Sequence, residues 1–166
     1  MMPTLYYINV TIHVLAALVW LGGMFFLALV GAPVLRGVEP AELRQVLFDQ
    51  LGRRFRSVGW IALGVLLVTG VANLYFRGLM HWQGVWANGA FWRSTWGAAL
   101  AVKLAAVLVM LVVEGYHDWV LGPRAGQIVA NTPAAAAFRR RASMYARVAA
   151  VCGLIIVVAA VRLARA

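Results

Sequence analysis

The sequence predicts an all-α integral membrane protein, a four-helix bundle. Hydrophobic residues make up 64% of the chain and charged residues only 12%, which excludes an ordinary soluble globular domain. Four apolar stretches reach the roughly 20 residues that a helix needs to cross a bilayer. These are residues 6–30, 58–76, 96–116 and 145–161. With their connections they use the whole chain, so we expect residues 1–166 to form a single transmembrane domain.

Apolar runs of this length also exclude a membrane barrel, whose strands alternate apolar and polar residues. The first stretch is longer than the core of a signal peptide, and no Lys or Arg precedes it within residues 1–11. We therefore expect it to be retained as a span. The lone Cys152 excludes an intramolecular disulfide.

The basic residues predict how the chain is oriented in the membrane. Residues 31–57 and 118–144 carry nine arginines: Arg36, Arg44, Arg53, Arg54, Arg56, Arg124, Arg139, Arg140 and Arg141. The opposite side carries four, namely Arg77, Arg93, Arg162 and Arg165. Under the positive-inside rule the arginine-rich connections face the cytoplasm and both termini face the periplasm of a bacterial inner membrane. We expect these arginines to contact lipid headgroups of the bilayer, and we expect no nucleic acid partner.

The connections also contain predicted elements. Glu39-Pro40 followed by spaced apolar residues predicts a short amphipathic helix lying on the inner surface, with Gly52 ending it. Thr132-Pro133 predicts the start of one helix that continues into the fourth span. The aromatic-rich outer loop, residues 77–95, is typical of an interfacial belt.

Two ionisable residues within the spans are the strongest functional signal. His13 is seven residues past Tyr6, and Lys103 is seven residues past Trp96, so both should lie about 10 Å below the outer surface. Asn9 lies one turn from His13 on the same helix face, and Thr69 and Asn73 are four residues apart near the outer end of the second span. Titratable groups inside a bilayer are costly, which makes each of them a functional-site hypothesis.

Two interpretations of this constellation stay open. His13 can bind haem iron, copper or zinc as a neutral imidazole, with Lys103 pairing with a haem propionate in the haem case. In the copper case, Met80 and His81 in the outer loop would add a thioether and a second imidazole. Alternatively, His13 forms a hydrogen bond to Thr69 or a carbonyl, and Lys103 extends to the outer headgroups.

A second group lies further along the third span. Lys103, Glu114 and His117 are separated by near-integral numbers of helical turns and therefore share a face. Glu114 and His117 are predicted either to form a structural ion-pair cluster with Asp118, Arg53 or Arg54, or to supply a second haem or metal ligand at His117.

Three segments resemble the copper-resistance protein D (CopD) family. They are HVLAALVWLGGMFFLALVGAPVLR at 13–36, RRFRSVGWIALGVLLVTGVANL at 53–74 and TWGAALAVKLAAVLVML at 95–111. The chain is more loosely similar to HemJ-type protoporphyrinogen oxidases, which are four-helix haem b proteins, although His117-Asp118 stands where that family has paired histidines. The first resemblance implies copper handling in a minimal four-helix member, beside a periplasmic copper carrier.

The residues and the resemblances together leave three hypotheses. The first is copper handling at a periplasm-facing site built on His13, with Lys103 and Asn73 supporting it and Met80 and His81 forming an entry site. The second is a haem b protein that transfers electrons or oxidises a lipophilic substrate. The third is a structural subunit of a larger membrane complex. The sequence is compatible with either copper or haem b as the cofactor, and with an enzyme or a protein without catalytic activity.

Overall fold

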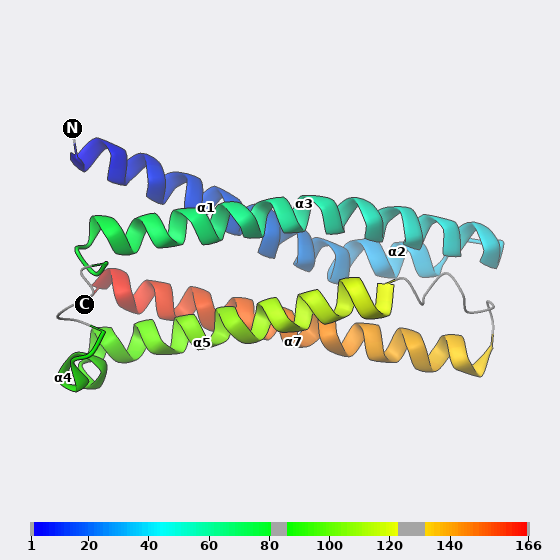
Figure 1. Cartoon of the computed structure of the whole chain (residues 1–166). Helices are drawn as coiled ribbons and strands as arrows, with labels where there is room; N and C mark the ends of the chain where they lie inside the picture. Colours follow the sequence, from blue (N-terminus) through cyan, green and yellow to red (C-terminus); the bar gives the residue numbers. More distant parts are fainter. Residues whose placement is uncertain (1, 81–85, 123–131, 166) are drawn as a thin grey trace. The chain divides into compact units, whose positions relative to one another are not determined.

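The computed structural model describes residues 2–80, 86–122 and 132–165. All of its long elements are helices, and these residues contain no strand, which confirms the all-α prediction. The chain divides into two compact units, Met1–Ala87 and Asn88–Ala166. Each unit is a hairpin of two long antiparallel helices (Figure 1). We call them hairpin one and hairpin two.

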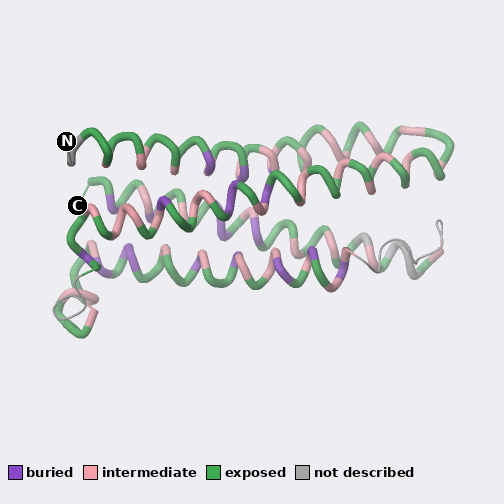
Figure 2. The backbone as a smooth tube through the Cα atoms, turned by 45° about the horizontal axis from the view of Figure 1, so that its top comes forward, coloured by how far each residue is buried: buried purple, intermediate pink, exposed green. Residues whose placement is uncertain are grey.

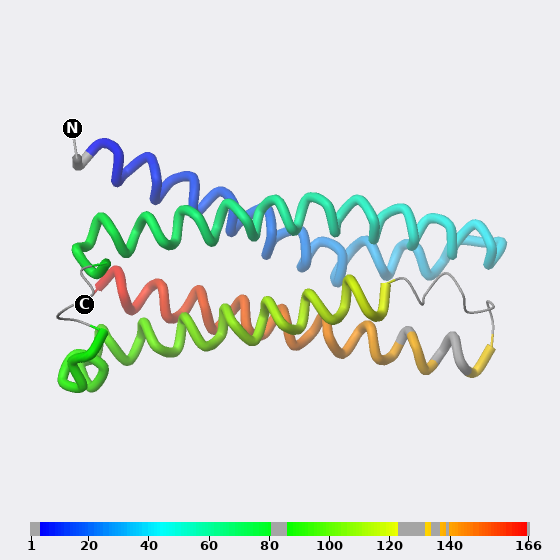
Figure 3. Tube along the Cα trace, in the orientation of Figure 1, coloured from blue at the N-terminus to red at the C-terminus, as the bar shows by residue number. Residues whose placement is uncertain are grey.

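Hairpin one is formed by the first two spans, and α1 packs along α3 within it. Its elements are α1 (Met2–Phe26), the π-helical turn η1 (Leu27–Gly31), α2 (Ala32–Arg36) and α3 (Ala41–Phe76). Figure 3 traces this path from the N-terminus to the end of α2 and back along α3.

Aromatic side chains and glycines interlock α1 with α3. The Trp20 ring is 4% exposed and lies over Gly59, where an added Cβ would be 3.8 Å from Trp20 Cδ1. In the opposite direction, the Phe55 ring covers Gly23 so closely that an added Cβ would lie 2.5 Å from Phe55 Cε2. Close backbone approach at small residues holds helices together in lipid, where apolar burial gives little drive.

The turn η1 has a cause in the sequence. Pro33 has no backbone N–H, and in a regular α-helix its ring would clash with the carbonyl four residues before it. The preceding turn is widened instead, and the Ala32 N–H bonds to the Leu27 oxygen five residues back. The first span therefore continues to Arg36, beyond the predicted end at residue 30.

The prediction of a separate surface helix at residues 40–51 is wrong. Helix α3 begins after Pro40 as predicted, but it runs through Gly52 to Phe76 without a break. One glycine inside a helix costs only about 1 kcal/mol. The Arg53–Asp49 ion pair (3.0 Å) bridges that position, and Leu51 packs beside Gly31 of the first span.

Hairpin two contains the last two spans, and α5 packs along α7 within it. Its elements are α4 (Gly89–Arg93), α5 (Thr95–Tyr116), the π-helical turn η2 (His117–Leu121) and α7 (Pro133–Arg165). The prediction of one helix from Pro133 into the fourth span is confirmed. Helix α5 starts at the N-cap Ser94, whose Oγ accepts a hydrogen bond from the Gly97 N–H at 3.0 Å.

Four helical segments are long and apolar enough to cross a membrane, which confirms the predicted spans with longer ends. They are Thr4–Arg36, Ala41–Phe76, Thr95–Leu121 and Arg140–Arg165. In the most apolar 18-residue stretch of each segment, between 11% and 28% of the residues are buried. Figure 2 shows exposed residues along most of every long helix. Because so many exposed side chains are large and apolar, they suit a lipid environment rather than water.

Candidate functional site

A polar network joins the two helices of hairpin one, and we call it the His13 network: Asn9, His13, Thr69 and Asn73. Each helix supplies two residues one turn apart, so the four side chains meet between α1 and α3. His13 Nδ1 lies 2.7 Å from Thr69 Oγ1. Asn9 Nδ2 donates to the Thr69 carbonyl and to Asn73 Oδ1, both at 3.0 Å.

The hydrogen bonds of Thr69 determine the tautomer of His13. The Thr69 hydroxyl has one hydrogen, and it donates that hydrogen within its own helix, to the Val65 carbonyl at 2.6 Å. The hydroxyl must therefore accept from His13, so His13 Nδ1 carries the proton. In a neutral imidazole the lone pair then lies on Nε2, the atom that can ligate a metal.

The surroundings hold the His13 ring in place. Thr69 is only 7% exposed, and His13 is half-buried. A Cβ added at Gly70 would lie 3.6 Å from His13 Cε1, so the ring edge faces the α3 backbone at this glycine. The α3 backbone therefore covers this edge of the imidazole ring.

Aromatic contacts join the same two helices at the end of the hairpin nearest the N-terminus. The Tyr6 and Phe76 ring centroids are 6.0 Å apart, and Arg77 donates to the Tyr6 hydroxyl at 3.3 Å. His13 lies seven residues further along α1, about 10 Å along the helix axis. His13 thus lies well within the span, whereas Asn9 and Asn73 lie nearer this end.

Lys103 and Met80 belong to other elements of the chain than the His13 network. Lys103 is half-buried in α5 of hairpin two, so a site shared with His13 stays a prediction. Met80 is 45% exposed and follows the turn after α3. His81 lies outside the described residues.

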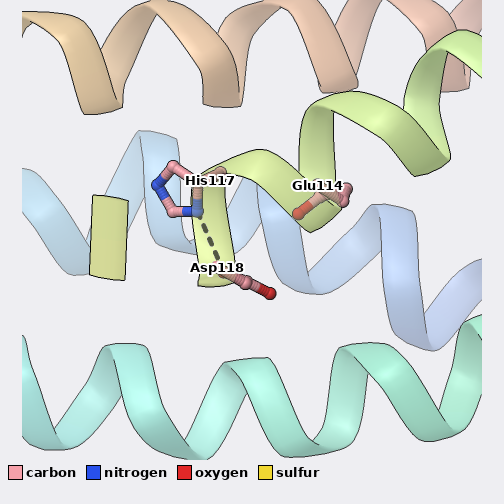
Figure 4. A group of neighbouring side chains, drawn as sticks. All are labelled: Glu114, His117 and Asp118. Atoms are coloured by element: carbon pink, nitrogen blue, oxygen red, sulfur yellow. Dashed lines mark hydrogen bonds and ion pairs between the residues drawn. The ribbon is translucent and has the colours of Figure 1, made fainter. Parts of the chain in front are cut away.

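A second polar group lies where α5 passes into η2, and we call it the Glu114 cluster: Glu114, His117 and Asp118. One ligand atom from each residue lies within 4.8 Å of the others. Figure 4 shows the His117–Asp118 hydrogen bond, with the Glu114 carboxylate beside it. His117 Nδ1 is 2.9 Å from Asp118 Oδ1, which confirms the predicted local pairing with Asp118.

The backbone widens at this cluster. In η2 the Gly122 N–H bonds to the His117 carbonyl five residues back. Trp119 turns back over Gly115, where an added Cβ would lie 3.3 Å from Trp119 Cζ3. Asp118 is 8% exposed, whereas Glu114 and His117 are half-buried.

The sequence predicts His117 as a possible haem or metal ligand, whereas it predicts Glu114 and Asp118 only as members of an ion-pair cluster. The spacing of four residues between Glu114 and Asp118 was the signal for a third donor, because residues at this spacing share a helix face. The widened turn η2 has the same signal in the sequence as η1, because Pro123 follows its last residue by two positions, as Pro33 follows Gly31.

Comparisons with known proteins bear on the region that holds most of these residues. The sequence matches the family described as Copper resistance protein D (CopD) over residues 49–163, more than half of the chain. An uncharacterised protein of Aquifex aeolicus (strain VF5) is 32% identical over 115 residues, which cover 69% of this chain and 68% of the relative. No solved structure matches the chain significantly.

The family match begins inside α3 and ends near the end of α7. It includes Thr69, Lys103 and the Glu114 cluster, while His13 precedes it. The predicted resemblance to the CopD family is confirmed by a match of this extent, and the four apolar helices agree with it. The looser resemblance to HemJ-type proteins stays a prediction. The chain therefore belongs to the copper resistance protein D family and is a multi-pass membrane protein.

Proposed function

We propose that the protein handles copper at a bacterial inner membrane and binds the ion through His13 on the periplasmic side. The observation that carries this proposal is the orientation of the imidazole. Thr69 holds His13 Nδ1 as a hydrogen-bond donor, which leaves the lone pair on Nε2. Metal-binding histidines characteristically donate the other ring N–H to a neighbouring acceptor, which fixes the ring and raises its basicity.

The remaining residues of the network support copper binding indirectly, by positioning Thr69. Asn9 donates to the Thr69 carbonyl and is itself bonded to Asn73. Asn73 is thus a positioning residue, since it acts on His13 through Asn9 and Thr69. Family membership favours copper as the metal, and imidazole suits copper.

A single imidazole does not complete a copper site. Within the described part of hairpin one, His13 is joined by the amide and hydroxyl groups of Asn9, Thr69 and Asn73. We propose that Met80 and His81 supply a thioether and a second imidazole when copper arrives. Met80 is exposed beyond the end of α3, where a periplasmic copper carrier would reach it. Soft sulfur ligands select Cu(I).

The test measures Cu(I) affinity of the full chain in detergent, by competition with a chromogenic chelator. His13→Ala and His13→Gln should lose the tightest site. His13→Gln keeps a side-chain donor for Thr69 and so preserves the hairpin. His117→Ala is the matched control, since it removes a histidine from another span, and it should retain that site. Copper affinity unchanged in folded His13→Gln would overturn the proposal.

An oxidised-minus-reduced visible spectrum of the same samples tests the haem b alternative. A reduced haem band that disappears in His13→Gln contradicts copper handling and makes the protein a haem b protein, with Lys103 the candidate partner of a propionate. Wild-type protein that is folded but binds neither copper nor haem would instead favour a structural subunit of a larger complex. Copper binding without a haem band is the result we expect.

A further inference from the structure

We propose that the Glu114 cluster is a second metal site, for a divalent cation of the zinc class. It lies on hairpin two, and its donors are two carboxylates and one imidazole. The proposal is independent of copper binding at His13, because the two sites share no residue.

The ligand atoms are already gathered. They lie within 4.8 Å of one another, and all come from one five-residue stretch of chain. Zinc binds imidazole nitrogen and carboxylate oxygen at about 2.0–2.2 Å, so neighbouring ligand atoms around it are roughly 3.5 Å apart. Small side-chain rotations of Glu114 and Asp118 would close the site, with water completing the coordination.

The existing hydrogen bond prepares two of the three ligands. A proton now lies between His117 Nδ1 and Asp118 Oδ1, which are 2.9 Å apart. A cation that replaces this proton binds the same two atoms, and the proton leaves to solvent. Metal binding to protonated ligands releases protons in this way.

The location also favours a cation. Glu114 is 19 residues after Thr95, about 29 Å along the helix, near the far edge of the hydrocarbon layer. Asp118 is buried and Glu114 half-buried, so their negative charges are poorly hydrated there. A divalent cation between them would add to the hydrogen bond from His117 that already offsets part of this cost. His117, whose side chain is 33% exposed, leaves a route for the ion.

The helix geometry brings the three donors together. The turn η2 begins at His117, directly after the last residues of α5. The sequence has Pro123 two residues after this turn, the spacing at which Pro33 follows η1, so the widening has the same cause. The turn carries two of the three donors, and the third lies one turn before it.

The donor set separates this site from a Cu(I) site. Its three donors include no thiolate or thioether, the ligands that select Cu(I). Nitrogen and oxygen donors together suit zinc and similar divalent ions. We therefore expect His13 variants to change copper binding and Glu114 cluster variants to change zinc binding.

The experiment uses Zn²⁺ alone as the probe, with the full chain in detergent, equilibrium dialysis and metal analysis. The double variant Glu114→Gln/Asp118→Asn should bind one Zn²⁺ fewer than the wild type. Glu114→Gln alone should weaken that site at least about 10-fold. Zn²⁺ should also raise the melting temperature of the wild type, and the double variant should lack this shift.

Two controls make the result specific. Asp49→Asn removes a partly exposed carboxylate that pairs with Arg53 on α3, and it should keep wild-type zinc binding. His13→Gln should also keep it, whatever its effect on copper. Equal zinc stoichiometry in the folded double variant would overturn the proposal, as would loss of the site in Asp49→Asn. If the double variant does not fold, Glu114→Gln alone decides the question.

Discussion

The two polar groups of this protein are built in opposite ways. The His13 network joins residues 56 to 64 positions apart in the sequence and links two helices with hydrogen bonds between neutral groups. The Glu114 cluster comes from one short stretch and contains ionisable groups. In the first, a ligand atom is oriented by the packing of a helix pair. In the second, the ligand atoms are brought together by the local winding of one chain segment.

This difference has a consequence for mutagenesis. Changes in the His13 network should alter both metal binding and the stability of hairpin one, because the same bonds serve both. Changes in the Glu114 cluster should alter metal binding with less effect on folding. Variants of the two groups test this contrast, and the largest effects are expected where a metal ligand is removed.

Variants that remove the ligands of one polar group at a time should affect the binding of one metal and not of the other. We expect His13→Gln to weaken Cu(I) binding about 100-fold or more, since the metal loses its imidazole ligand, and to leave zinc binding unchanged. Glu114→Gln/Asp118→Asn should do the reverse. Chelator competition with each metal measures both effects. Loss of both metals in either variant would show that the groups act as one site.

Removing the hydroxyl that orients His13 should have the next largest effect. Thr69→Val keeps the size of the side chain but removes the acceptor for His13 Nδ1, and we expect Cu(I) affinity to fall about 10–100-fold. Thr11→Val is the matched control, because the exposed Thr11 hydroxyl bonds only to the Tyr7 carbonyl among the interactions described. Equal copper affinities in these two variants would contradict the role of Thr69.

The interlocking of α1 and α3 predicts a stability effect that involves no polar group. Gly23→Ala places a Cβ against the Phe55 ring and should lower the free energy of unfolding by about 1–2 kcal/mol relative to Gly22→Ala. Gly22 has no neighbouring atom within 4 Å of an added Cβ, and both variants share the gain in helix propensity. Denaturant titration followed by circular dichroism measures the difference. Equal stabilities would mean that the ring turns aside without cost.

The smallest effect is expected at Asn9. Asn9→Leu removes two hydrogen bonds between α1 and α3 and should cost about 1 kcal/mol, the range measured for polar contacts between membrane helices. The same unfolding assay measures it, and Glu114→Gln without metal should change stability less. A larger loss in Glu114→Gln would reverse the contrast between the two groups.

The spans could be predicted from the sequence because apolar length is a local property of the chain. The meeting of His13 with Thr69 was also predictable, since both residues needed polar partners at similar depth. The continuity of α3 through Gly52 was not predictable, because it depends on Asp49, Arg53 and the contact of Leu51 with Gly31. The tautomer of His13 was not predictable either, since it follows from the bond between Thr69 and Val65.

Copper binding as proposed requires that His13 present an unprotonated Nε2 to the ion while Nδ1 stays bonded to Thr69. Nitrogen-15 magnetic resonance of the histidine-labelled full chain in bilayers tests this directly, with His13→Gln assigning the signal among the three histidines. We predict a protonated Nδ1 and an unprotonated Nε2 whose resonance alone moves strongly when Cu(I) is added. A protonated Nε2, or an Nε2 resonance that Cu(I) leaves unchanged, would contradict the account.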